Sequence, residues 1–268
     1  MGEQPLPAWT SLVPIQPNGS RPPLFGVHWA GGEVDFYQDL ARHLGPDQPL
    51  YGLQALGVDR QRPPHTSIRD MAAHYLTEVR SLQPQGPYFL TGASLGGKVA
   101  YEMAQLLHGQ GQRVGLLALL DTILEKQDLS LKQRLQLHSG KVSTTDRASV
   151  VAYALGRAWI RARRTFLRIC YRLEIPLPRS MWDLVETTIY AAQHYRPAPY
   201  AGNAILFRAT LRDPRGRQGL FLGWERLIRG GIEVIEIPGE HASLVREPSV
   251  AVVAAILCER MDRALRSG

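Results

Sequence analysis

The sequence is organised around residues 87–109, PYFLTGASLGGKVAYEMAQLLHG. An apolar run at 88–91 leads into Gly92-Ala93-Ser94-Leu95-Gly96, and apolar residues then recur at helical spacing up to Gly109. A G-x-S-x-G pattern between a strand and a helix is typical of a nucleophile elbow, whose tight turn requires small flanking residues. The positive end of the new helix favours negative charge beside the hydroxyl. This stretch predicts a nucleophilic serine, Ser94, at the edge of a sheet.

Two other interpretations of this stretch are weaker. A glycine-rich turn with an incidental serine does not require a strand before it and a helix after it, and both patterns are present here. A phosphate-binding loop requires G-x-x-x-x-G-K-[ST], and although Lys98 follows Ser94 by four residues, that pattern is missing.

The rest of the chain alternates between strand and helix patterns. We expect strands at 24–30, 49–53, 88–91, 114–120, 204–208 and 232–238. We expect helices at 34–44, from the Ser67 cap to about 82, after Ser94, around 222–228 and at 250–265. The run VGLLALL at 114–120 is apolar on both faces, which indicates a central parallel strand. The alternation predicts an α/β protein with a mostly parallel, doubly wound sheet.

Two segments depart from this alternation. Residues 1–23 are rich in proline and read as an extended leader or linker, so the folded domain is expected to span 24–268. Residues 123–196 show helical patterns only, which predicts an inserted helical lid. Within it, one helix face carries a stripe of arginines, and the opposite face carries apolar residues. The stripe is Arg157, Arg161, Arg164, Arg168 and Arg172; the apolar face is Trp159, Ile160, Phe166, Leu167 and Cys170.

Composition narrows the class of protein. The chain has 268 residues, 44% of them hydrophobic, which suits one large α/β domain with an insertion. Its two cysteines, Cys170 and Cys258, are far apart, so we expect neither a metal site nor a disulfide framework. No export signal or membrane-spanning run is present, and a cytoplasmic location is expected. The net charge of +7 fits either an ordinary basic surface or an acidic partner, whereas nucleic-acid motifs are missing.

A serine nucleophile needs a base, and the base needs an acid to orient it. Four histidines follow Ser94: His108, His138, His194 and His241. Only His241 comes directly after a predicted strand, at the sheet edge where the serine is expected. Asp121 ends the strand that follows the elbow helix and is favoured as the acid. Asp213, in the loop after 204–208, remains the competitor.

The oxyanion that forms during attack needs preorganised N–H donors. We expect one from the backbone of Leu95, directly after the nucleophile. The other is expected from Ala30, in the loop Trp29-Ala30-Gly31-Gly32 that ends the first predicted strand. Both residues act through the main chain, so their side chains are uninformative.

Several blocks of the sequence together resemble the thioesterase domains that end nonribosomal peptide and polyketide synthases, relatives of the fatty-acid synthase thioesterase. The blocks are LVPIQPNGSRPPLFGVHWAGG, SIRDMAAHYLTEVRSLQPQGPYFLTGASLGGKVAYEMAQLL, LLALLDT and GIEVIEIPGEHASLVREP. The resemblance runs from about residue 12 to the C-terminus and implies an α/β-hydrolase fold with a helical lid. It also implies a triad of Ser94, Asp121 and His241, which supports Asp121 over Asp213.

By this resemblance the substrate is an acyl or peptidyl chain, carried as a thioester on the phosphopantetheine arm of a carrier protein. No other cofactor is expected. Carrier domains of this kind are typically acidic, which offers a partner for the arginine stripe. Release would follow from attack on a Ser94 acyl-enzyme by water, or by a hydroxyl or amine of the chain itself.

The sequence departs from the family pattern at two positions. Trp29 stands where the H-P-A-G-G block usually has proline, and Leu95 stands where an aromatic residue is common. Trp29 is therefore a candidate residue of the substrate channel. Three alternatives to a terminal releasing domain stay open: a stand-alone editing thioesterase, an esterase acting on free esters, and a non-catalytic module that only binds a carrier.

Overall fold

A computed structural model describes residues 10–124, 147–211 and 219–267. The chain divides into two compact units. The larger unit comprises Met1–Glu125 and Trp182–Gly268, and the smaller comprises Lys126–Met181. The lid predicted over 123–196 covers the smaller unit and continues into the larger one.

A seven-stranded sheet forms the centre of the larger unit, with strand order β1-β3-β2-β4-β5-β6-β7. Its strands are β1 Leu12–Gln16, β2 Leu24–Val27, β3 Leu50–Leu53, β4 Tyr88–Ala93, β5 Val114–Leu120, β6 Asn203–Ala209 and β7 Gly231–Ile237. Edge strand β1 runs antiparallel to β3, and the other neighbours are parallel. Because parallel strands share one carboxyl edge, the residues that follow them gather there.

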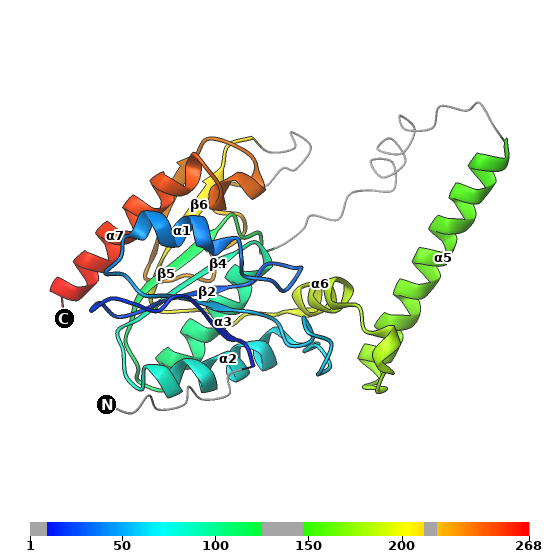
Figure 1. The fold of residues 1–268 in the computed structure, drawn as a ribbon, viewed down its shortest axis with the longest axis horizontal. Coiled ribbons are helices and arrows are strands. Elements are labelled where there is room, and N and C mark those ends of the chain that lie inside the picture. The colour runs from blue at the N-terminus through cyan, green and yellow to red at the C-terminus, as the bar shows by residue number, and fades with distance from the viewer. Residues whose placement is uncertain (1–9, 125–146, 212–218, 268) are drawn as a thin grey trace. The chain divides into compact units, whose positions relative to one another are not determined.

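Helices cover both faces of this sheet (Figure 1). The helices of the larger unit are α1 Tyr37–Leu44, α2 Ile68–Leu82, α3 Leu95–Gly109, α6 Leu184–His194 and α7 Ser249–Arg266, with a short 3-10 helix, η2, at His241–Val245. Helix α6 packs against α3. Helices α2 and α3 lie on one face, and α1 and α7 lie on the other. Strand β5 contributes alternate residues to the two hydrophobic cores, Leu117 and Leu119 to one and Leu116 and Leu120 to the other. This two-sided burial explains its unbroken apolar sequence.

Strand β1 lies inside the segment that the sequence predicts to be a leader, so the expected boundary at residue 24 is wrong. Pro14 sits within it, which an edge strand tolerates. The Glu78 carboxylate on α2 accepts hydrogen bonds from the backbone N–H groups of Thr10, Ser11 and Leu12. The strand is therefore tied to the domain by a side chain that local sequence patterns do not reveal.

The helix predicted around 222–228 is also wrong, since the segment forms a series of turns. Leu222 and Gly223 both have positive φ, 53° and 93°, which is incompatible with a right-handed helix. Their apolar neighbours still reach the core, where Trp224 is fully buried and donates its indole N–H to the carbonyl of Thr122. The apolar residues of this segment therefore reflect burial in the core and do not indicate a helix.

The smaller unit contains α5, Arg147–Arg172, and a 3-10 helix, η1, at Arg179–Met181. Four stripe arginines, Arg161, Arg164, Arg168 and Arg172, are exposed, and the side chain of Arg157 lies outside the described residues. The opposite face is only partly covered: Leu167 and Cys170 are buried, whereas Trp159 is 71% exposed. In the described part of the chain, no helix is long and apolar enough to cross a membrane.

Candidate active site

Ser94 lies in the tight turn between β4 and α3. Its φ of 56° and ψ of −114° are unusual for a residue with a side chain. A Cβ on Gly92 would lie 2.3 Å from backbone atoms of Gly96, and a Cβ on Gly96 would lie 2.3 Å from the carbonyl oxygen of His28. Only glycine allows these approaches, so the strained turn requires the pattern found in the sequence.

Asp121 follows the last residue of β5 and is fixed by the neighbouring strand. Its N–H donates to the carbonyl of Phe207 at 2.7 Å, and its Oδ1 accepts the N–H of Ala209 at 3.1 Å. Both partners belong to β6. The side chain is almost fully buried, which leaves Oδ2 with a defined direction.

His241 is the first residue of η2, four residues after β7 ends. Its Nδ1 lies 2.6 Å from Oδ2 of Asp121. With Nδ1–H donating to this carboxylate, Nε2 is left as the proton acceptor. The imidazole is about half exposed, whereas Leu244 and Val245 of the same helix are buried in the core and anchor it.

The register of the sheet makes Ser94 and Asp121 neighbours. Ala93 pairs with Leu120 across β4 and β5, and the N–H of Ser94 donates to the carbonyl of Leu120 at 2.9 Å. Both residues therefore leave the sheet at the same edge. Among the described residues, no hydrogen bond joins the Ser94 hydroxyl to His241. Catalytic hydrogen bonds often form only when substrate binds, and we expect the nucleophile–base contact to form at that step.

The loop after β2 contains the second predicted oxyanion donor, Ala30. The carbonyl of Trp29 accepts hydrogen bonds from the N–H of Gly32 at 3.0 Å and from Nδ1 of His28 at 2.5 Å. In the described residues, the N–H of Ala30 has no protein acceptor. Leu95 is the first residue of α3, where an N–H has no acceptor within the helix. Both predicted donors are thus available to a ligand.

His28 is held in its neutral form beneath this loop. It is completely buried, and burial lowers its pKa to about 4. Because Nδ1 donates to the Trp29 carbonyl, Nε2 accepts the hydroxyl of Tyr75, at 2.8 Å. The imidazole therefore links the loop to α2.

Trp29 is the first residue of this loop, and its indole is stacked on Phe36 at a ring-centroid distance of 4.7 Å. The edge of the indole lies close to Gly31, where an added Cβ would be 3.3 Å from the indole nitrogen. The stacking gives the indole a fixed position at the oxyanion loop. Its role in a substrate channel stays a prediction.

The chain is similar to proteins of one known family. Residues 22–258 match the thioesterase domain family. The chain belongs to this family. The thioesterase domain is 32% identical to malpinin synthetase of Mortierella alpina, in an alignment that covers 93% of the present chain. It is 30% identical to a dimodular nonribosomal peptide synthase of Bacillus subtilis, over 94% of the present chain. It spans only 3% and 11% of those two relatives.

Solved structures extend the comparison to the fold. The NocB thioesterase domain, in covalent complex with a fluorophosphonate nocardicin G analogue, is 27% identical with a TM-score of 0.63. The alignment covers 95% of this thioesterase domain and 99% of NocB. The four-domain nonribosomal peptide synthetase AB3403 is 24% identical with a TM-score of 0.67, over 93% of this chain and 20% of the synthetase. The predicted α/β-hydrolase fold is confirmed, and family and fold make the domain a hydrolase acting on thioesters.

The other candidate residues of the thioesterase domain lie elsewhere. His108 packs against Tyr200, and Nδ1 of His194 lies 2.9 Å from the carbonyl of Tyr190 in its own helix. Asp213 and His138 lie outside the described residues. Among the residues that are described, no cluster of three or more potential metal ligands occurs.

One contact at the site has no signal in the sequence. The hydroxyl of Thr188, on α6, donates to the carbonyl of Ala30 at 2.8 Å. Thr188 lies within a segment that reads only as helical lid, and its partner is 158 residues away in the chain. Only the folded structure brings the two together.

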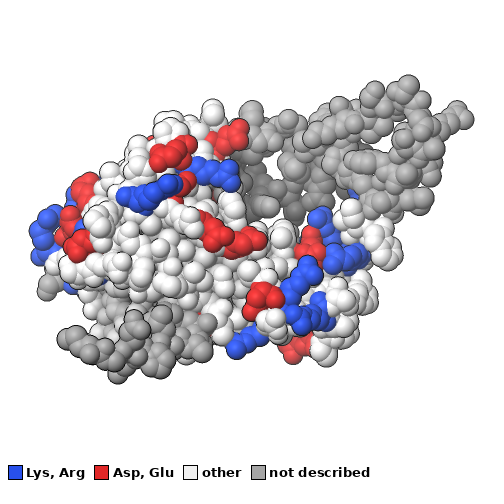
Figure 2. Space-filling model, in the orientation of Figure 1, with Lys and Arg blue, Asp and Glu red and all other residues white. Residues whose placement is uncertain are grey.

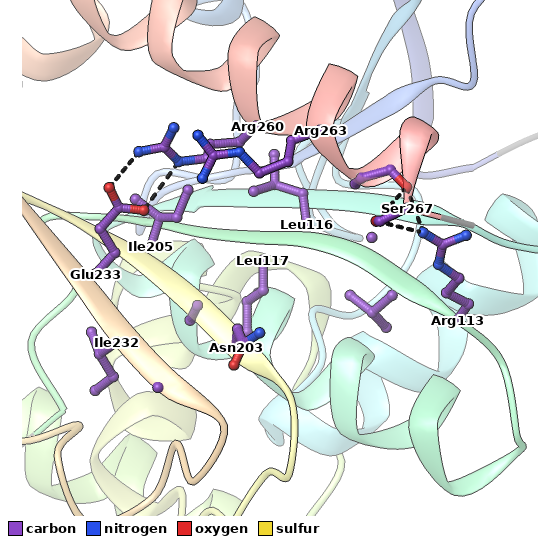
Figure 3. Close-up of a pocket in the computed structure, with 15 residues that line it drawn as sticks. Arg113, Leu116, Leu117, Asn203, Ile205, Ile232, Glu233, Arg260, Arg263 and Ser267 are labelled. Atoms are coloured by element: carbon purple, nitrogen blue, oxygen red, sulfur yellow. Dashed lines mark hydrogen bonds and ion pairs between the residues drawn. The ribbon is translucent and has the colours of Figure 1, made fainter.

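A cavity of about 590 Å³ lies at the opposite end of the strands. It is lined by the first residues of β5, β6 and β7 and by the end of α7 (Figure 3). Its arginines already have partners: Arg260 binds Glu233, and Arg113 binds the carbonyl of Ala264. The cavity therefore belongs to the amino edge of the sheet and is separate from the site at the carboxyl edge.

Proposed function

We propose that the domain releases an acyl or peptidyl chain from the phosphopantetheine arm of a carrier protein, through an acyl-enzyme on Ser94. The observation that carries this proposal is the hydrogen bond between His241 and Asp121, at the sheet edge where the strained Ser94 turn ends. The family and the solved structures support the reaction class. The biological setting is expected to be nonribosomal peptide or polyketide biosynthesis.

The first half of the reaction forms the acyl-enzyme. Nε2 of His241 takes the hydroxyl proton of Ser94 as the oxygen attacks the thioester carbonyl. The N–H groups of Leu95 and Ala30 stabilise the resulting oxyanion. The carbon–sulfur bond then breaks, and the pantetheine sulfur leaves with the proton held by His241. Asp121 keeps the imidazole oriented and stabilises its charge.

The second half releases the chain. His241 removes a proton from water, or from a hydroxyl or amine of the chain, as that group attacks the acyl-enzyme. Water yields a free acid, and internal attack yields a lactone or lactam. Return of the proton to Ser94 restores the enzyme.

Intact-protein mass spectrometry with acyl-pantetheine thioesters of varied chain length tests this proposal. We expect a transient acyl adduct on the wild-type domain and none on Ser94→Ala. Ser243→Ala is a matched control, because Ser243 lies in the same 3-10 helix as His241 and its hydroxyl donates to the carbonyl of Glu240, away from the proposed triad. The mass of the released product distinguishes the acid from the cyclic form, which differ by one water.

Three other outcomes would contradict the proposal. No adduct and no thiol release by the wild-type domain with any chain would favour a non-catalytic carrier-binding module. Faster turnover of free esters than of thioesters would indicate an ordinary esterase. Preference for short, incorrect acyl groups over long chains would favour an editing thioesterase.

We also propose that the exposed arginines of α5 contact the acidic carrier. Figure 2 shows acidic and basic side chains interspersed on the face that it presents, so the net charge of +7 is not spread as one continuous basic field there. A local stripe that includes Arg161 and Arg164 offers a more concentrated positive charge.

Charge reversal tests this contact. Arg161→Glu combined with Arg164→Glu should weaken carrier affinity most at low ionic strength, where screening is least. Arg226→Glu combined with Arg229→Glu, at two exposed positions of the larger unit, changes the net charge by the same amount and is the matched control. Unchanged affinity of the double variant at low salt would contradict the proposed contact.

A further inference from the structure

The direction of the Ala30 N–H is set by the carbonyl on the other side of the same peptide bond. A trans peptide is planar, so the carbonyl of Trp29 and the N–H of Ala30 point in opposite directions. Hydrogen bonds from His28 and Gly32 hold that carbonyl. They therefore aim the Ala30 N–H as well.

The next peptide, between Ala30 and Gly31, also has to be held. Otherwise the φ and ψ angles of Ala30 could change and alter the orientation of one peptide plane relative to the other. The carbonyl of Ala30 accepts the hydroxyl of Thr188 at 2.8 Å. Thr188 is completely buried, and its other acceptor, the carbonyl of Val185, lies farther away at 3.0 Å. With both flanking peptides held, the backbone of Ala30 has little freedom.

The helix that bears Thr188 is itself attached to the helix that begins after the nucleophile. Lys98 of α3 donates to the carbonyl of Ala192 at 3.1 Å. The hydroxyl of Tyr195, directly after α6, donates to Glu102 of α3 at 2.7 Å. At its other end, Leu184 packs against Gly32, where a Cβ would lie 2.6 Å from the leucine side chain. Helix α6 thus connects the oxyanion loop to the nucleophile helix.

We propose that Thr188 is a positioning residue for the oxyanion hole. By holding the Ala30 carbonyl, Thr188 orients the Ala30 N–H. The inference rests on the proposed function in that Ala30 is taken as an oxyanion donor. Thr188 itself does not touch the substrate. Because α6 directly follows the smaller unit in sequence, the hole includes a support contributed by the segment that leads out of the insertion.

Substitution of the hydroxyl tests the proposal. Thr188→Val keeps the side-chain shape and removes the donor, so we expect kcat for a short thioester to fall about 10- to 100-fold with little change in KM. The rate at which a fluorophosphonate labels Ser94 should fall in parallel. Thr188→Ser restores the hydroxyl and should recover most of the activity.

The neighbouring threonine provides the matched control. The hydroxyl of Thr187 donates to the carbonyl of Asp183 at 2.7 Å, within the first turn of α6. Thr187→Val should leave kcat and labelling near wild type. Equal losses in Thr187→Val and Thr188→Val would mean that α6 packing alone matters, and wild-type kcat in Thr188→Val would overturn the proposal.

A readout that is independent of catalysis separates this inference from the proposed function. The backbone amide resonances of Ala30 and Gly31 should shift in Thr188→Val and stay in place in Thr187→Val. If those shifts occur but the wild-type domain is never labelled or acylated, the positioning contact stands and the proposed function fails. If the wild-type domain is acylated and the amide resonances do not move, the positioning role is wrong.

Discussion

The imidazole of His241 and the carboxylate of Asp121 are 120 residues apart in the chain and are joined at 2.6 Å in the structure. One follows β7 and the other follows β5, with β6 between them supplying the Ala209 N–H that fixes the carboxylate. The three strands together therefore set the orientation of the proposed base.

Asp121→Asn tests that orientation. An amide in place of the carboxylate favours the wrong tautomer of His241, so kcat should fall about 10⁴-fold while the domain stays folded. Thioester turnover and thermal melting, measured on the same samples, check both parts. A variant that melts normally and retains more than a tenth of wild-type kcat would rule out Asp121 as the acid, and Asp213 would become the candidate.

Gly96→Ala should destabilise the domain by at least about 2 kcal/mol, because the added Cβ would meet backbone atoms that cannot move aside. Those atoms are the carbonyl oxygens of His28 and Val27, at 2.3 Å and 2.6 Å. Gly109→Ala is the matched control, since nothing lies within 4 Å of its Cβ position. At this last position of α3 alanine should stabilise by about 0.5–1 kcal/mol. Urea denaturation of the two variants should shift in opposite directions.

Glu78→Gln should loosen β1. Burial alone would raise the pKa of Glu78, but hydrogen bonds from Thr10, Ser11 and Leu12 outweigh it and lower the pKa below its ordinary value. A depressed carboxyl pKa stabilises the native state above the unfolded pKa, and this contribution is lost as the pH falls through the folded pKa. At neutral pH, the amides of β1 should be less protected from exchange in Glu78→Gln than in the wild-type domain. As the pH falls through the folded pKa of Glu78, protection in the wild-type domain should fall toward that of the variant.

The control for that experiment is Glu102→Gln, which removes the charge that accepts the Tyr195 hydroxyl. It should leave exchange in β1 unchanged. Equal protection of β1 in both variants would show that strand pairing alone holds it.

His28 should make the domain less stable in mild acid. Its pKa is lowered from 6.5 to about 4 by burial, so between these values the unfolded chain binds a proton that the native state does not. Stability should fall by about 1.4 kcal/mol per pH unit for this proton as the pH drops from 6.5 to 4, and then level off. Burial also lowers the pKa of His65 to about 4, which adds to the slope over the same range.

Comparison with His28→Gln isolates the contribution of this residue. The wild-type domain should exceed the variant in free energy of unfolding by more at pH 7 than at pH 4.5. A difference that stays constant over this range would show that His28 carries its proton in the native state as well.

Elements with a local signal can be predicted from the sequence. The run 114–120 agrees with β5 at both ends because it is apolar on both faces. Ser67 accepts the N–H of Asp70 as the capping pattern indicates. The turn around Ser94 follows from its glycines, whose absent side chains leave space for neighbouring backbone.

Features that depend on distant partners cannot be predicted in this way. Strand β1 is stabilised by Glu78, 66 residues beyond Leu12, and Thr188 meets Ala30 only after folding. The turns at 222–228 follow from positive φ at Leu222, a conformation that its side chain does not signal. The sequence places Asp121 and His241 after strands, but the hydrogen bond between them depends on the order of the strands in the sheet.

Lys98 connects the two ends of the inserted segment through hydrogen bonds. Its ammonium donates to the carbonyl of Leu124, shortly after β5, at 2.9 Å and to the carbonyl of Ala192, in the last turn of α6, at 3.1 Å. The entropy cost of closing a loop grows only slowly with its length, so a longer or shorter segment between these two contacts would change that cost little. Replacing residues 126–181 with the corresponding segment of a related synthetase would leave both of these contacts and Thr188 in place, and should therefore leave the oxyanion loop supported as before.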